Sequence, residues 1–208
     1  MTPSRLAIVK LGGSLASSPS LRAWLDVCAG AGAGRMAIVP GGGPFADAVR
    51  AAQRQWGFDG ARAHRMALLA MEQYGQMLIG MQPALVAADS ASAIGHAVAR
   101  GEVPVWMPSA MVLARADIPA SWSVTSDSLA AWLARELHAT LLVLVKSVEI
   151  TEARAALTAL VERGWVDAEF PRFAAAAGCP VRILGGEDQP VLARMLADNE
   201  LKGLEAVE

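Results

Sequence analysis

The residues best suited to chemistry in this sequence are two lysines and two glycine-rich turns. Lys10 ends one apolar run and is followed by the first turn, while the second turn follows another apolar run. Glycine lets the backbone approach a ligand closely, and exposed N–H groups in such turns bind anions. Two turns side by side would bind two neighbouring phosphate groups, which is the arrangement that phosphoryl transfer needs. The turn residues are Gly12, Gly13 and Ser14, and then Gly41, Gly42 and Gly43.

Lysine is scarce in this chain, which has three lysines against fifteen arginines. Lys10 and Lys146 nonetheless both stand where a buried strand is expected to end. Lysine is a compact and mobile charge that can follow a transferring phosphoryl group. The structural alternative is a side chain that extends from a strand end to solvent. We interpret both lysines as candidate catalytic residues. For the turn 41–43, the alternative is a tight connector that leads into a helix, with Pro44 at its first position.

Strand-like and helix-like segments alternate along the chain, which predicts an α/β fold with a mainly parallel sheet and a single domain over residues 1–208. The carboxyl ends of parallel strands meet at one edge of a sheet, where ligands bind. The turns after 6–11, 36–39 and 140–147 should therefore lie together. The expected strands are 6–11, 36–39, 104–108, 140–147 and 181–184. The expected helices are 20–29, 45–56, 62–82, 125–139 with its preceding loop, 152–163 and 188–197.

The amino-acid composition of the chain limits the kinds of partner that it is expected to bind. The net charge of −2 and the pI of about 5.9 do not favour nucleic acid or an anionic membrane as a partner. Two cysteines are too few for a disulfide framework, and the His and Cys spacings predict no metal site. No signal peptide and no apolar run long enough for a membrane span is recognisable. We expect a cytoplasmic protein that acts on a small molecule.

The segments VKLGGS, PGGGPFADAVR and TSDSLAAWLA, in this order and followed by a strand, resemble the amino acid kinase family. The resemblance covers nearly the whole chain, including a closing strand, helix and strand over 181–207. It implies a three-layer α/β/α sandwich and an enzyme that uses ATP with Mg²⁺. It also implies a homo-oligomer, for which the Met-rich helix 62–82 is a plausible contact surface. The resemblance is strongest to the short subfamily of aminomethylfuran phosphate kinases of methanofuran biosynthesis.

The resemblance also assigns roles to individual residues. Lys10 would contact the transferring phosphoryl group, with the turn 12–14 on the terminal phosphates of the nucleotide and the turn 41–43 facing the acceptor. Asp127 would orient the catalytic lysines by lying between two ammonium groups. The alternative for Asp127 is a plain N-cap of the helix that follows.

The segment before that helix supplies candidate acceptor-binding residues. Under the resemblance, Thr125 and Ser126 would line the acceptor pocket as hydrogen-bond donors. Trp122 either stacks against a flat acceptor ring or packs as an ordinary loop tryptophan. Elsewhere, His64 opens the long helix and either contacts the acceptor or forms part of a solvated helix start, which is the interpretation we prefer. Arg50 and Arg54 are interpreted as surface charge.

The sequence departs from the family in one turn. Most members have an acidic turn of the TDVDG type after the central strand, whereas this chain reads VKSVEI, with Glu149 as its acidic residue. The later glycine–methionine segment that usually brings a second lysine is absent. We therefore hypothesise that Lys146 replaces that lysine. ATP is the family's usual nucleotide and is not specified by this turn.

Several functions remain open at this stage. The same loops would serve a phosphate monoester, such as an aminomethylfuran methyl phosphate. They would equally serve a carboxylate or amino acid acceptor, or a nucleoside monophosphate. A further alternative is a relative that binds a nucleotide or an oxyanion without turnover.

Overall fold

The computed structural model describes residues 6–198 and 201–207. Its strands are β1 (Ala7–Leu11), β2 (Met36–Pro40), β3 (Leu85–Ala88), β4 (Val103–Trp106), β5 (Leu141–Val145), β6 (Arg154–Ala156), β7 (Val181–Leu184) and β8 (Leu204–Val207). Its α-helices are α1 (Leu21–Ala31), α2 (Gly43–Trp56), α3 (Gly60–Met81), α4 (Ala91–Ala99), α5 (Ser109–Val112), α6 (Ser126–Glu136), α7 (Leu157–Glu162), α8 (Phe170–Ala177) and α9 (Gln189–Asp198). A short 3-10 helix, η1 (Gly13–Ser17), follows β1.

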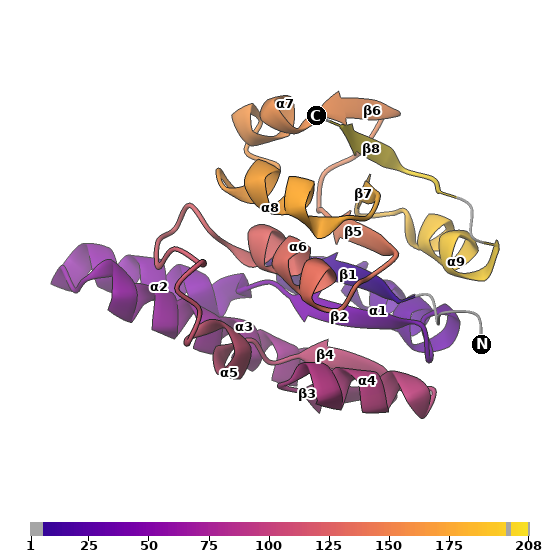
Figure 1. Cartoon of the computed structure of the whole chain (residues 1–208), viewed down its shortest axis with the longest axis horizontal. Helices are drawn as coiled ribbons and strands as arrows, with labels where there is room; N and C mark the ends of the chain where they lie inside the picture. Colours follow the sequence, from indigo (N-terminus) through magenta and orange to yellow (C-terminus); the bar gives the residue numbers. More distant parts are fainter. Residues whose placement is uncertain (1–5, 199–200, 208) are drawn as a thin grey trace.

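All eight strands of the described residues form one sheet, in the order β3-β4-β2-β1-β5-β7-β8-β6. Every neighbouring pair is parallel except β7 and β8. Helices cover both faces of the sheet (Figure 1). The predicted three-layer α/β/α sandwich with a mainly parallel sheet is therefore confirmed. No helix in the described ranges is both long and apolar enough to span a bilayer.

The two faces of the sheet bury two separate apolar cores. One core joins β1 to α1, α3 and α9, and contains Val9 and Leu11. The other joins β1 to α4, α6, α7 and α8, and contains Ile8. Successive side chains of a strand point to opposite faces, so Lys10 projects with Ile8 toward the α6 side. Helix α2 packs on the outside of α3 rather than on the sheet, with Val49 and Ala70 between the two helices.

The secondary structure predicted from the sequence was wrong in part of the C-terminal third of the chain. The expected helix 152–163 is in fact strand β6, followed by the shorter helix α7. Strand β6 has only three residues and pairs with β8, about fifty positions later in the chain. A local sequence pattern could therefore not predict it. Helices α4 and α8 and strand β3 were also not predicted, and the strand expected at 104–108 is β4, one residue earlier at its start.

The turns after β1 and β2 touch each other through their backbones. The Gly41 N–H donates to Leu11 O at 2.9 Å. A Cβ atom on Gly41 would lie 2.3 Å from the Gly13 nitrogen, and one on Gly13 would lie 2.4 Å from the Gly43 nitrogen. Any side chain at these positions would push the turns apart. The two turns predicted to lie together do so, and they require glycine at their contact.

Two matched substitutions test this contact. We expect Gly41→Ala to lower the free energy of unfolding by about 1–3 kcal/mol, because its methyl group collides with backbone. We expect Gly30→Ala to raise it by roughly 0.5–1 kcal/mol, because Gly30 lies in α1, where an added Cβ meets nothing within 4 Å. Urea unfolding of both variants measures the difference. Equal effects of the two substitutions would contradict the close contact of the turns.

Candidate active site

Three charged side chains with little exposure to solvent meet at the carboxyl edge of the sheet. Strands β1 and β5 are neighbours, with Lys10 opposite Leu144, so Lys146 projects from the same face two residues further on. The first turn of α6 covers that face and carries Asp127. Its Oδ1 atom lies 2.9 Å from Lys10 Nζ and 2.7 Å from Lys146 Nζ. One carboxylate oxygen therefore binds both ammonium groups.

Burial and mutual attraction set the charges of this cluster. The side chains of Lys10, Asp127 and Lys146 are 6%, 7% and 12% exposed. Burial disfavours the Asp127 carboxylate, but the two ammonium groups outweigh it and hold its pKa at about 2. Burial lowers the pKa of Lys146 to about 8, with Asp127 opposing the change and Lys10 adding to it. The three-residue cluster has two cationic groups for one anionic group, which favours an anionic ligand.

A cavity of about 400 Å³ opens beside this cluster, and we call it the lysine cavity. Both lysines, the turn 12–14 and the loop 164–167 line it. Gly13 and Ser14 begin η1, and the first N–H groups of a helical turn have no partner within it. The Gly12 N–H instead donates to Val145 O at 3.2 Å. Gly13 and Ser14 are thus better placed than Gly12 to offer amides to an anion.

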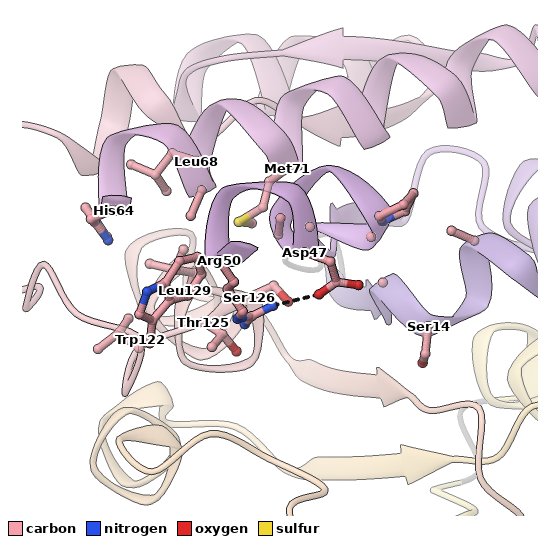
Figure 2. A pocket seen from close by; sticks show the side chains of 18 of the residues that line it. Ser14, Asp47, Arg50, His64, Leu68, Met71, Trp122, Thr125, Ser126 and Leu129 are labelled. Atoms are coloured by element: carbon pink, nitrogen blue, oxygen red, sulfur yellow. Dashed lines mark hydrogen bonds and ion pairs between the residues drawn. The ribbon is translucent and has the colours of Figure 1, made fainter. Parts of the chain in front are cut away.

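A second cavity of about 450 Å³ lies between η1, the start of α2, α3 and the loop before α6, and we call it the α2–α3 cavity (Figure 2). It shares four residues with the lysine cavity, which are Gly13, Ser14, Trp122 and Thr125. The two cavities therefore meet at the 13–14 turn. Of the predicted acceptor residues, this cavity is lined by Gly42, Gly43, Trp122, Thr125 and Ser126. Gly41 lies against Gly13 instead.

Trp122 forms a fixed wall of the α2–α3 cavity. Its indole N–H donates to Gln53 Oε1 at 2.7 Å. The Arg50 guanidinium carbon lies 4.3 Å from the Trp122 ring centroid, and Arg50 Nη1 lies 3.1 Å from Asp47 Oδ1. Figure 2 shows this ion pair beside the cavity. Arg50 is a partly exposed surface charge, as expected, but it also lines the cavity, whereas Arg54 is simply exposed.

His64 also lines the α2–α3 cavity, at the start of α3. It is half-buried rather than solvated, and burial lowers its pKa below the ordinary value. Its imidazole is therefore mainly neutral at pH 7, with one ring nitrogen able to donate a hydrogen bond and the other able to accept one.

Asp167 was not predicted, although it lines the lysine cavity. Its Oδ2 accepts hydrogen bonds from the Thr125 N–H and hydroxyl at 2.8 Å each. The Thr125 hydroxyl is therefore already engaged and does not donate to a ligand as expected. Thr125 is the N-cap of α6, so the alternative of Asp127 as a plain N-cap is wrong. Asp167 is 39 residues from Ser128, its other partner, in a loop without any motif that could have revealed it.

The described residues contain no group of three or more His, Cys, Asp or Glu side chains placed to hold a metal ion. In the lysine cavity, Asp127 is bound to two ammonium groups and Asp167 to the first turn of α6. These carboxylates do not form a cation-binding set.

Comparisons with known proteins show which family and which fold this chain shares. A sequence profile of the amino acid kinase family matches residues 5–151. The [5-(aminomethyl)furan-3-yl]methyl phosphate kinase of Methanocaldococcus jannaschii is 28% identical over 146 residues, which are 68% of this chain and 66% of that protein. The matched region thus spans just under two thirds of that relative's length.

Solved structures share the fold. Uridylate kinase from Archaeoglobus fulgidus has a TM-score of 0.71 at 16% identity, with 97% of this chain and 99% of that chain covered. UMP kinase from Ureaplasma parvum has a TM-score of 0.70 at 14% identity, with 99% of each chain covered. An isopentenyl phosphate kinase has a TM-score of 0.63 at 17% identity, with 97% of this chain and 100% of that chain covered. At these identities the likeness concerns the fold alone.

Two substitutions in the charged cluster should differ in their effect on stability. Asp127→Asn leaves two neighbouring ammonium groups buried without their carboxylate, so we expect the free energy of unfolding to fall by about 3–5 kcal/mol. Lys146→Met keeps the Lys10–Asp127 pair and removes one buried charge, so we expect a change within about 1 kcal/mol. Urea unfolding at pH 7 measures both values. An equal loss in the two variants would refute the role of Asp127 as the shared counter-charge.

Proposed function

We propose that this chain, which belongs to the amino acid kinase family, transfers the γ-phosphoryl group of MgATP to a phosphate monoester. The observation that carries the proposal is the meeting of two cavities at Gly13 and Ser14, beside the cluster of Lys10, Asp127 and Lys146. The lysine cavity would receive the nucleotide phosphates, and the α2–α3 cavity would receive the acceptor. The transferring group would then lie at their junction.

The reaction would be an in-line displacement at the γ-phosphorus. An oxygen of the acceptor phosphate forms the new bond, the bond to the β–γ bridging oxygen breaks, and ADP leaves. Lys10, Lys146 and the amides of the 13–14 turn would neutralise charge on the transferring group. Asp127 would keep both ammonium groups in place. A strong general base is unnecessary, because a phosphate monoester is already ionised near neutral pH. The Mg²⁺ would arrive with the nucleotide.

The acceptor is proposed to combine a phosphate, a flat ring and an amine. The name of the Methanocaldococcus jannaschii relative specifies such a molecule, an aminomethylfuran that carries a methyl phosphate. In the α2–α3 cavity, Trp122 offers a flat wall to a ring, and the Asp47 carboxylate offers a partner to a protonated amine. The product would be the corresponding diphosphate, for a methanofuran-type carrier of one-carbon units.

We also propose a cytoplasmic location and self-association. Both Cys28 and Cys179 are free thiols, which is typical of a reducing compartment. Large apolar side chains on α2 and α3 are exposed, among them Trp56, Met66 and Leu69. Such side chains are frequent at interfaces between subunits.

An acceptor panel tests the proposed reaction. We expect ADP release with MgATP and the aminomethylfuran phosphate, and a diphosphate product detected by mass spectrometry. Activity only with uridylate or with a carboxylate such as an amino acid would assign another acceptor class. Tight ATP binding without turnover on any acceptor would identify a nucleotide-binding protein instead.

Lys146→Ala tests the hypothesis that Lys146 serves as the second catalytic lysine. We expect kcat to fall by about 10²–10³-fold, because a donor to the transferring group is lost. Circular dichroism should show the fold unchanged. A rate near that of the wild type would refute the role of Lys146.

The pH dependence of kcat/KM tests the role of Lys146 independently. The free enzyme has a Lys146 pKa of about 8, so we expect kcat/KM to decline above pH 8 as the ammonium loses its proton. Bound phosphates favour the charged form and should move the corresponding decline in kcat to higher pH. Lys146→Arg, which stays charged, should remove the decline in kcat/KM. A profile of kcat/KM that is unchanged in this variant would exclude Lys146 as the titrating group.

A further inference from the structure

Asp167 binds the first turn of α6 from outside the helix. Its Oδ2 accepts the Thr125 N–H and hydroxyl at 2.8 Å each, and the Ser128 N–H at 3.1 Å. Its Oδ1 accepts the Ser128 hydroxyl. Thr125 is the N-cap residue, but its side chain makes no capping bond within the helix. The four bonds satisfy two backbone amides of the α6 start, whose partial positive charge also favours a carboxylate.

A second bond joins the same two segments. The Glu169 N–H donates to Ser123 O at 3.1 Å, two residues before the N-cap. The loop that carries Asp167 is therefore attached to the α6 start at two places. Residues 164–167 of this loop also form part of the wall of the lysine cavity. The loop thus links the cavity wall directly to the helix turn that presents Asp127.

Asp127 lies between the two residues that Asp167 binds. Thr125 and Ser128 flank it in the sequence, so the four bonds fix the backbone on both sides of it. Its Oδ1 has to stay within hydrogen-bond distance of two ammonium groups at once. A displacement of about 1 Å would break at least one of these contacts, and misplacement of this size is known to reduce reaction rates strongly.

We propose that Asp167 is a positioning residue, which holds the first turn of α6 so that one Asp127 oxygen lies between Lys10 and Lys146. This inference rests on the proposed phosphoryl transfer. Asp167 acts through α6 and does not itself contact the reacting atoms. Without it, Asp127 would lose its fixed place between the lysines. Lys146 would then stay buried beside Lys10 with a weaker counter-charge.

The small number of lysines allows a test that needs no activity. Lysine-selective isotope labelling gives three side-chain NMR signals, which Lys→Arg variants assign. In Asp167→Asn, we expect the Lys146 titration midpoint to move to lower pH by about one pH unit, because its contact with Asp127 is weakened. The Lys202 signal serves as the internal reference. The charged side chains that line the lysine cavity together with Lys146 are Lys10, Asp127 and Asp167.

Two further variants separate positioning from the loss of a charge. Thr125→Val with Ser128→Ala removes two of the four donors and keeps the Asp167 carboxylate, so the Lys146 midpoint should move in the same direction. Asp59→Asn is the matched control, because Asp59 caps α3 by accepting the Arg62 N–H at 2.7 Å. It should leave the Lys146 midpoint unchanged. If the Lys146 midpoint moves in Asp167→Asn but not in the double variant, the shift comes directly from the lost Asp167 charge. That result would overturn the proposal that Asp167 positions Asp127.

Measurements of kcat and KM provide a second test of the role of Asp167. We expect Asp167→Asn to lower kcat on the order of 10–100-fold with a smaller change in the KM for MgATP, and Asp59→Asn to behave as the wild type. An unshifted Lys146 midpoint in folded Asp167→Asn would overturn the proposal. Should that variant not fold, the Thr125–Ser128 double variant gives the same readout. A wild-type protein that transfers phosphoryl to no acceptor would refute the proposed function, while the NMR result would still decide the role of Asp167.

Discussion

Two ammonium groups are buried around a single carboxylate oxygen, and the rest of the site depends on this contact. Lys10 and Lys146 are held within 3 Å of Asp127 Oδ1 with little access to water. Two like charges so placed repel each other strongly, so the carboxylate must be both ionised and fixed in position. The cluster requires three elements to meet, namely the ends of β1 and β5 and the start of α6. A parallel sheet with a helix above this edge provides that meeting point.

A second constraint is the contact between the turns after β1 and β2. Gly41 and Gly13 approach so closely that a methyl group on either would collide with the backbone of the other turn. This contact places the start of η1 beside the start of α2, and the two cavities open on either side of it. The turn 13–14 can therefore face both cavities, as a transfer between two bound molecules requires. The glycines are needed for this packing, in addition to the anion binding that we propose for them.

The α2–α3 cavity has a distinct set of lining residues. Its wall is Trp122, held by Gln53 and covered on one side by Arg50, with Asp47 paired to that arginine. A carboxylate, a guanidinium and an indole around one cavity are suited to an acceptor that carries charges of both signs and a flat ring. The lysine cavity differs, because it is dominated by the two lysines, the 12–14 turn and the 164–167 loop. The two cavities thus suit ligands of different chemistry.

The family resemblance implied the place of Asp127 between the two lysines. The sequence by itself determined the strands β1, β2 and β5, the two glycine turns that follow the first two, and the position of Lys10 and Lys146 at one edge of the sheet. These features are local, because apolar runs, glycine turns and strand parity are all legible within about ten residues. Only the tertiary structure decided that Arg50 lines a cavity and that residues 154–156 form a strand. It alone also brought Asp167 to the start of α6. Each of these three placements depends on contacts with residues distant in the chain, and such contacts cannot be predicted from a short segment of sequence.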